Sequence, residues 1–449
     1  MRLDILTKYD QPVPRYTSYP TALHFHDGIN EGAYRNWLSE LSPAEPLSLY
    51  LHIPFCDSLC WFCGCHTKIA QRYAPVGDYL EAMACEFKLV TECLGTKRRL
   101  CRLHFGGGTP TIIEPSGVYK IGRLLQQYFS FGEDTDFALE IDPREVRQNM
   151  IAAWADIGAT RASLGVQDVN LDVQEAVHRI QPFETTARVV EWLRAAGIQG
   201  INVDLMYGLP RQTAIHVLAT VDKVLTLKPS RLALFGYAHV PWMKPHQRLI
   251  LDSELPDPQA RLIQSEAARA RLVEAGYVQI GLDHFALPSD PLARALRRGT
   301  LHRNFQGYTT DDAKILIGLG ASSIGSLPQG YVQNTIPIRQ YIQAVRAGRL
   351  PVARGVLLRD EDFLRRAIIE RLMCDLRVDL AAISRGFGVK TLPFSRELAA
   401  LEPLETDGLV EISNHTIRVL PEGRPLLRTV CSVFDSYLQT GADRHSRAI

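Results

Sequence analysis

Residues His52–His66 read HIPFCDSLCWFCGCH and place four of the chain's nine cysteines in one short loop. Cys56, Cys60 and Cys63 have the spacing C-x3-C-x2-C, with an aromatic residue directly before the third cysteine. This spacing lets one loop bind three corners of a cubane [4Fe–4S] cluster and leaves the fourth iron without a protein ligand. A substrate amine and carboxylate can chelate that open iron. We therefore predict Cys56, Cys60 and Cys63 as the metal ligands.

A structural zinc site is the alternative, with Cys65 or His66 as a fourth ligand. Zinc sites usually pair two separated C-x2-C knuckles, and this chain has no second knuckle. Cys65 as a fourth cluster ligand is sterically awkward, because only Gly64 separates it from Cys63. The remaining cysteines are expected in the core as small hydrophobic residues: Cys85, Cys93, Cys101, Cys374 and Cys431.

The cysteine loop follows the first of six strand-like runs, which alternate with helical periodicities. The predicted strands are Leu47–Ile53, Arg102–Phe105, Phe137–Ile141, Arg161–Val166, Ile201–Met206 and Arg231–Phe235. The predicted helices are Tyr79–Leu94, Val118–Tyr128, Val146–Ile157, Thr186–Ala196 and Ile215–Leu227. Such β-α units imply a parallel sheet. Because the distinctive side chains all follow strand ends, the fold class is predicted to be α/β, an open (β/α)6 partial barrel of the TIM type.

These strand-end groups are the candidate binding residues. They are Gly106–Pro110 after strand two, Glu140 and Asp142 after strand three, Gln167 and Asp168 after strand four, Asp204 near the end of strand five, and Tyr237–His239 after strand six. A glycine turn exposes backbone groups that can bind an amino acid's carboxylate and ammonium, although alone it is often only a turn. Glu140 and Asp204 are either ordinary surface carboxylates or acceptors for ribose hydroxyls. Arg179 suits a carboxylate, and otherwise it is a solvated helix residue.

Length and composition indicate several domains of an ordinary soluble protein. The chain has 449 residues, 46% hydrophobic and 22% charged, with a formal net charge of +1, which argues against a role driven by bulk charge on nucleic acid. No stretch approaches the roughly 18 apolar residues of a membrane span, and Met1–Arg15 does not resemble a signal peptide.

We expect an irregular surface arm at 1–44 with exposed tyrosines, a barrel at 45–285, and a mostly helical domain at 286–449 with a winged-helix-like end. Four arginines between Arg294 and Arg303 form either a solvated face or a carboxylate site.

The cysteine spacing and the glycine turn together resemble the radical S-adenosylmethionine (SAM) superfamily. More of the chain resembles one family within it, the oxygen-independent coproporphyrinogen III oxidases. The matching stretches are Pro14–Ala22, Leu47–Cys65, Leu103–Thr111, Glu140–Glu145, Gly165–Asp168, Asp204–Pro210, Tyr237–His239, Asp283–Ala286, His302–Thr310 and Phe434–Tyr437. Two stretches, Asp10–Val13 and Asp311–Ala313, depart from the family pattern.

The resemblance implies a [4Fe–4S] cluster and two SAM molecules. The cluster-bound SAM would contact Tyr50, Gly107, Glu140, Ala238 and Ile324. The second would contact Phe62, Gly108, Thr109, Gln167, Arg179 and Asp204. The family reaction uses 5′-deoxyadenosyl radicals to convert two propionates of coproporphyrinogen III to vinyls, with loss of CO2, in haem biosynthesis. No residue is assigned as catalytic.

The resemblance also implies the partners. They are coproporphyrinogen III and an electron donor and acceptor that the sequence does not identify. We expect no nucleic-acid partner and no membrane span. We also expect the protein to be a cytoplasmic monomer. The alternative functions are a radical-SAM-like haem chaperone, and a structural zinc protein that binds nucleic acid. The chaperone branch typically lacks the cysteine at position 65 and the Pro14–Pro20 motif, and both are present here.

Overall fold

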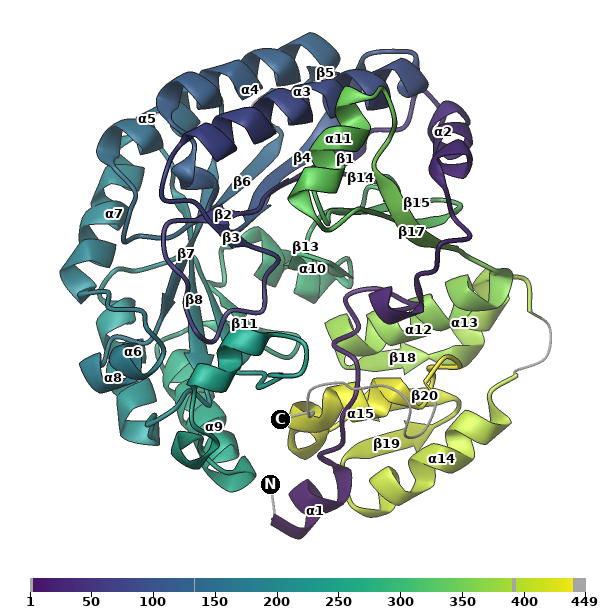
Figure 1. Ribbon diagram of the computed structural model, residues 1–449. Coiled ribbons are helices and arrows are strands. Elements are labelled where there is room, and N and C mark those ends of the chain that lie inside the picture. Colours follow the sequence, from purple (N-terminus) through teal and green to yellow (C-terminus); the bar gives the residue numbers. More distant parts are fainter. Residues whose placement is uncertain (1–2, 133, 390–392, 439–449) are drawn as a thin grey trace.

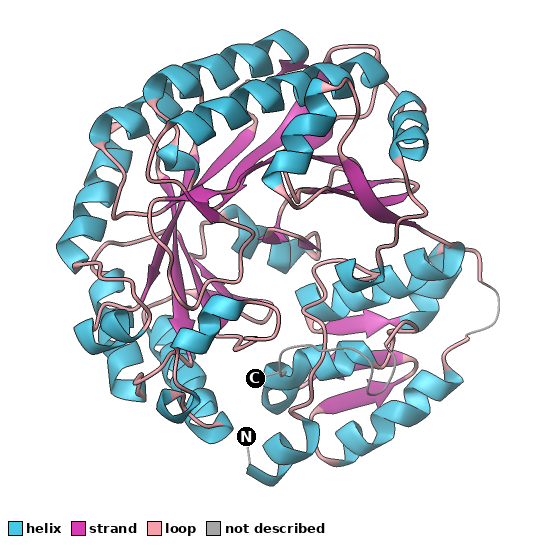
Figure 2. Ribbon diagram, in the orientation of Figure 1, coloured by secondary structure: helices cyan, strands magenta, loops and turns pink. Residues whose placement is uncertain are grey.

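A curved sheet of parallel strands forms the centre of the molecule, and helices cover its outer face (Figures 1 and 2). The structure is a computed structural model that describes residues 3–132, 134–389 and 393–438. The six parallel strands are β1 Leu47–Ile53, β4 Arg98–Gly107, β6 Asp136–Ile141, β7 Arg161–Gln167, β8 Gly200–Tyr207 and β9 Arg231–Gly236. The helices that follow them are α3 Ala74–Leu94, α4 Pro115–Tyr128, α5 Gln148–Asp156, α6 Leu171–Ala176, α7 Phe183–Ala195, α8 Ala214–Leu225 and α9 Pro258–Glu274. All six predicted strands are present, and β1 has the predicted bounds.

The barrel is open, as predicted. Its strands lie in the order β9-β8-β7-β6-β4-β1, and the two outer strands pair with other elements instead of with each other. β9 pairs with the antiparallel strand β11 (His284–Ala286), and β1 pairs in parallel with β14 (Leu316–Leu319). Because all six strands are parallel, their carboxyl ends meet at one rim.

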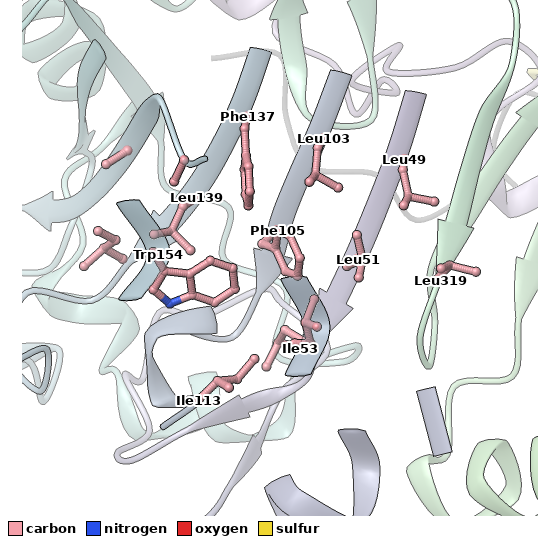
Figure 3. Close-up of a cluster of buried hydrophobic side chains, with 14 of the residues drawn as sticks. Leu49, Leu51, Ile53, Leu103, Phe105, Ile113, Phe137, Leu139, Trp154 and Leu319 are labelled. Carbon is pink, nitrogen blue, oxygen red and sulfur yellow. The ribbon is translucent and has the colours of Figure 1, made fainter. Parts of the chain in front are cut away.

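Side chains alternate between the two faces of these strands. Apolar side chains point to the helices and are buried, as Figure 3 shows for Leu103, Phe105 and Leu139. Trp154 of α5 fills the space beneath them, with its ring 4.7 Å from that of Phe105. The opposite face carries the polar side chains, so the sheet itself directs them into the barrel.

We expect Trp154→Ala to be strongly destabilising, because this fully buried indole contacts both Phe105 and Phe137. The loss should be about 3–5 kcal/mol in the free energy of unfolding, measured by urea unfolding followed by circular dichroism. Ile215→Ala is the control, since Ile215 is 77% exposed and its loss should cost less than about 0.5 kcal/mol. Equal effects of the two substitutions would contradict the core described here.

The sheet continues past residue 285, where the sequence predicts a boundary. Its further strands are β10 Val278–Ile280, β15 Ile324–Leu327, β16 Gly330–Asn334 and β17 Val352–Leu357, with β5 Phe129–Ser130 beside β4. Other elements of this region are α10 Pro291–Arg298, β12 His302–Asn304, β13 Gly307–Thr309 and α11 Ile338–Arg346. Short 3-10 helices cover Ala22–His24, Pro110–Ile112, Pro245–Leu249, Asp252–Glu254 and Pro421–Leu426. The predicted domain division thus cuts one continuous sheet.

A second core lies in the C-terminal part. Its elements are α12 Asp360–Asp375, β18 Arg377–Asp379, α13 Leu380–Gly386, α14 Ser395–Thr406, β19 Val410–Ser413, β20 Thr416–Val419 and α15 Leu427–Ser432. The strands form a small antiparallel sheet in the order β18-β20-β19. β19 and β20 form an antiparallel hairpin in the part of the chain where the sequence predicts a winged-helix-like end.

The N-terminal segment corrects a prediction. It contains α1 (Leu3–Tyr9) and α2 (Glu31–Ser39), and it runs along the C-terminal part, drawn purple in Figure 1. Tyr16 and Tyr19 are buried there instead of exposed. The Tyr16 hydroxyl donates to Asp435 over 3.1 Å. Prolines indicated an irregular path correctly, but local composition carries no information about the distant residues that bury the tyrosines.

Candidate functional site

The cysteine loop starts at the carboxyl end of β1. Backbone bonds fix its base, where β2 (Phe55–Cys56) pairs with β3 (Lys68–Ile69). Side chains from the segment after β9 fix the tip of the cysteine loop. Gln247 Nε2 donates to the Phe62 carbonyl over 3.0 Å, and Lys244 Nζ donates to the Cys65 carbonyl over 3.0 Å. The loop therefore lies across the open end of the barrel.

Cys60 is the buried member of the three predicted ligands, while Cys56 and Cys63 are half-buried. In the part of the chain that the structure describes, no three His, Cys, Asp or Glu side chains form a group that could hold a metal ion. Ligands of one cluster bind different irons, so they stand farther apart than ligands of a single ion. Cys65 is exposed, and its backbone N–H lies 3.4 Å from Cys63 Sγ.

The glycine turn lies against this loop at very close range. A Cβ at Gly108 would stand 2.2 Å from the Phe55 carbonyl oxygen and 2.9 Å from Cys56 Sγ. Gly107 has φ +116°, which favours glycine, and its N–H donates to Glu140 Oε2 over 3.0 Å. The missing side chains leave the space beside Cys56 that a cluster and its ligand need, so the residues present fit the cofactor.

Two arginines flank Cys60. A guanidinium nitrogen of Arg179 and one of Arg144 each lie 3.3 Å from Cys60 Sγ. Asp142 bridges both arginines, at 3.0 Å from Arg179 and 2.6 Å from Arg144. Burial opposes ionisation of Asp142, but the two guanidinium groups more than offset it and lower its pKa to about 2. The two guanidinium groups place positive charge beside Cys60, and Arg144 is a contact that sequence reasoning missed.

Tyr50 and Glu140 meet above β4. Tyr50 stands opposite His104 in the sheet register, with their rings 5.7 Å apart. Glu140 accepts from His104 Nε2 over 3.1 Å. Burial opposes ionisation of Glu140, but the bonds from His104 and Gly107 lower its pKa overall. Glu140 is thus a fixed carboxylate at the glycine turn, which matches its predicted position.

Asp204 lies on β8, opposite Gly165 of β7. It accepts from Ser163 Oγ and from Asn202 Nδ2, each over 2.8 Å. Burial, with the nearby Glu140 charge, raises the pKa of Asp204 to about 6. Gln167 ends β7 with φ +68°, at a register shift between β7 and β8.

The remaining predicted contacts come from three separate places. Thr109 is buried, and its Oγ1 accepts from the Asp142 N–H over 3.1 Å. The carbonyls of Phe62 and Ala238 share one donor, Gln247 Nε2. Ile324 begins β15, on the far side of β1. The predicted SAM contact sets stay predictions.

Glu86 of α3 fixes the turn that leads into Ile324. It is buried and accepts from the Gly320 N–H (2.7 Å), Asn334 Nδ2 (2.6 Å) and the Tyr341 hydroxyl (2.6 Å). Burial raises the pKa of Glu86 to about 7.

The folded state therefore binds the Glu86 proton more tightly than the unfolded state does. Its contribution to stability should be fully present below about pH 4.5 and fall as the pH rises to about 7, by on the order of 3 kcal/mol. Glu86→Gln should flatten this part of the pH dependence, measured by urea unfolding at pH 5 and pH 8. An unchanged pH dependence in the variant would rule out Glu86 as its source.

A cavity of about 1290 Å³ opens between the barrel, the N-terminal segment and the C-terminal part. Eight arginines line it, and they come from distant parts of the chain: Arg15, Arg261, Arg269, Arg303, Arg377, Arg418, Arg424 and Arg428. Of the predicted group between Arg294 and Arg303, only Arg303 lines the cavity. Arg294, Arg297 and Arg298 are exposed on α10, so for them the solvated-face alternative is correct.

The comparisons with known proteins agree with this geometry. A model of the Radical SAM superfamily matches residues 50–224, and a model of the HemN C-terminal domain matches residues 358–426. An oxygen-independent coproporphyrinogen III oxidase of Bradyrhizobium diazoefficiens is 48% identical over 450 residues, with 100% of both chains covered. One of Salmonella typhimurium is 40% identical over 98% of this chain and 96% of its own length. The solved structure of coproporphyrinogen III oxidase (HemN) from Escherichia coli, titled a radical SAM enzyme, is 38% identical, with a TM-score of 0.90 over 95% of this chain and 100% of that chain.

Proposed function

This chain belongs to the oxygen-independent coproporphyrinogen III oxidase family, and from that premise we propose how its residues divide the work of the reaction. The enzyme is an oxidoreductase of haem biosynthesis that oxidatively decarboxylates two propionates of coproporphyrinogen III to vinyls, giving protoporphyrinogen IX. It uses a [4Fe–4S] cluster and SAM. When reduced, the bound cluster supplies the electron that cleaves SAM to a 5′-deoxyadenosyl radical.

Cys56, Cys60 and Cys63 hold the cluster in this proposal. The support is their position on one loop at the rim, beside a glycine turn without side chains and two arginines at Cys60. That juxtaposition is the observation that carries the proposal. Cys65, being exposed, is not a ligand.

Two SAM molecules would bind at two sets of residues. The first would contact Tyr50, Gly107, Glu140, Ala238 and Ile324. The second would contact Gly108, Gln167, Arg179 and Asp204, together with Phe62 and Thr109. Asp204 accepts a ribose hydroxyl there, a role that its polar, half-buried position supports.

Equilibrium binding of SAM to the anaerobically reconstituted enzyme tests this division. We expect two SAM molecules per chain in wild type, and one per chain in Asp204→Asn. A single site in wild type would contradict the two-site proposal, whereas loss of both sites in the variant would contradict the assignment of Asp204 to the second.

The arginine-lined cavity receives the substrate, whose four propionates need cationic partners. It is built from one chain's own segments, which supports a monomer. All nine cysteines are unpaired, which supports a reducing compartment such as the cytoplasm. No helix among the described residues is long and apolar enough to cross a membrane. An electron donor and an acceptor complete the partners, and nucleic acid is not among them.

The division into an arm at 1–44, a barrel at 45–285 and a C-terminal domain at 286–449 remains our proposal for the folding units. Limited proteolysis tests it. Protection of a fragment that ends near residue 357 would place the boundary after β17 instead.

A further inference from the structure

Asp283 lines the cavity. It lies between β10 and β11, and its carbonyl accepts from the Leu234 N–H over 2.7 Å, which fixes the backbone. One carboxylate oxygen accepts from His284 Nδ1 over 2.7 Å, and the side chain is 17% exposed. The carboxylate therefore has a fixed position and a remaining face toward the cavity.

The charges nearest to Asp283 are positive. Arg303 and Arg15 both act on it electrostatically. Burial opposes its ionisation, but His284 and these arginines outweigh burial and lower its pKa to about 2. Asp283 is thus a carboxylate at every working pH.

The guanidinium groups of Arg15 and Arg303 are available to bind an anionic ligand. Within the described ranges, Arg15 and Arg303 form no ion pair with a carboxylate. Arg15 donates to the Gly236 carbonyl over 3.4 Å and Arg303 to the Arg15 carbonyl over 3.5 Å, and both are long contacts. Arg303 Nε and Nη1 are buried without a hydrogen-bond partner. Two other acids in the cavity wall, Glu266 and Asp375, already form ion pairs, with Arg269 and Arg371.

The sheet register places Asp283 and its neighbour His284 near Asp204, a residue of the proposed second SAM site. His284 stands opposite Ala233 of β9, and Ala233 stands opposite Asp204 of β8. Two strand spacings of about 4.8 Å separate these backbones. If the porphyrinogen ring is centred at Asp283, its edge therefore extends toward the barrel interior.

A porphyrinogen presents four pyrrole N–H donors at its centre and carboxylates at its rim. Its binding site consequently needs an acceptor in the middle and cations around it. We propose that Asp283 accepts hydrogen bonds from the pyrrole N–H groups of the substrate, while Arg15 and Arg303 bind its propionates. This inference rests on the proposed function, and it makes Asp283 the residue that distinguishes a porphyrinogen from a porphyrin.

Competitive binding measures this distinction. Coproporphyrin III has the same four propionates, but only two of its nitrogens carry hydrogen, and the other two present lone pairs that repel a carboxylate. Wild-type holoenzyme should bind coproporphyrinogen III about ten- to a hundredfold more tightly than coproporphyrin III. Asp283→Asn should lose most of that preference, because an amide both donates and accepts.

Two further variants separate the roles. Arg303→Gln should weaken both macrocycles by the same factor, because they share the propionates. Glu81→Gln is the control, and it should leave both Kd values unchanged, since Glu81 is 61% exposed, pairs with Lys120 and lies outside the cavity. Iron content and 5′-deoxyadenosine release without substrate should equal wild type in Asp283→Asn, which shows that the variant is folded and loaded.

The outcomes are distinct. No preference in wild type, or an unchanged preference in Asp283→Asn with normal iron content, overturns the role of Asp283. If Asp283→Asn fails to fold, two other results still test the proposal. They are the preference of wild type for coproporphyrinogen III over coproporphyrin III, and an equal rise of both Kd values in Arg303→Gln. If wild-type holoenzyme neither binds nor converts coproporphyrinogen III, the proposed function itself fails.

Discussion

Cys60→Ser should leave the enzyme without its cluster and without turnover. The serine hydroxyl remains neutral at working pH and is a poor ligand for iron compared with a thiolate. Cys60 is also the sulfur that both Arg179 and Arg144 face, so the substitution removes the sulfur from these two contacts. We expect iron and sulfide per chain to fall to background, and the rate of vinyl formation to fall by more than about a hundredfold.

The matched control lies in the same loop. Cys65→Ser changes an exposed cysteine two residues beyond Cys63, and it should keep full iron and sulfide content. Full iron content in Cys60→Ser, or loss of the cluster in both variants, would contradict the three-ligand assignment. Anaerobic purification followed by iron and sulfide analysis decides between these results.

Asp204→Asn should separate cluster assembly from turnover. Asp204 lies on β8, away from the cysteine loop, so iron and sulfide content should equal wild type. The carboxylate accepts from Ser163 and Asn202. The amide of the variant is neutral and keeps only one accepting oxygen, so it cannot accept from both partners and from a ribose hydroxyl as the carboxylate can. Protoporphyrinogen IX formation should fall by about a hundredfold or more.

The pH profile provides the internal check on Asp204. Burial raises its pKa to about 6, so the carboxylate is protonated below that pH and ionised above it. Wild-type activity should therefore rise as the pH increases through about 6, and the residual activity of Asp204→Asn should lack this rise. Wild-type vinyl formation in the variant would remove Asp204 from the site.

The sequence predicted the barrel well because its signals are local. Alternation such as that of Arg161–Gln167, together with helices of regular period, identifies parallel β-α units without knowledge of distant contacts. The later strands β14–β17 escaped prediction. Short runs such as Leu316–Leu319 have no alternation of their own, and only their pairing with β1 makes them strands.

The candidate site also has a part that local sequence signals predict and a part that they do not. Cys60, Gly107 and Glu140 follow strand ends, so topology alone places them at one rim. The cavity arginines come from the N-terminal segment, α9, β12 and the C-terminal part, and nothing in the neighbourhood of Arg15 or Arg428 in the sequence indicates that they meet. Tyr16 and Tyr19 were misjudged for the same reason, since their burial depends on residues more than four hundred positions away.

An anaerobic assay of the reconstituted enzyme with coproporphyrinogen III tests the central claim most directly. It counts the 5′-deoxyadenosine formed for each CO2 released, with the porphyrinogen product identified after oxidation. The account predicts one 5′-deoxyadenosine per CO2 and protoporphyrinogen IX as the final product. Release of CO2 without 5′-deoxyadenosine, or 5′-deoxyadenosine with no vinyl formed in the presence of substrate, would contradict it.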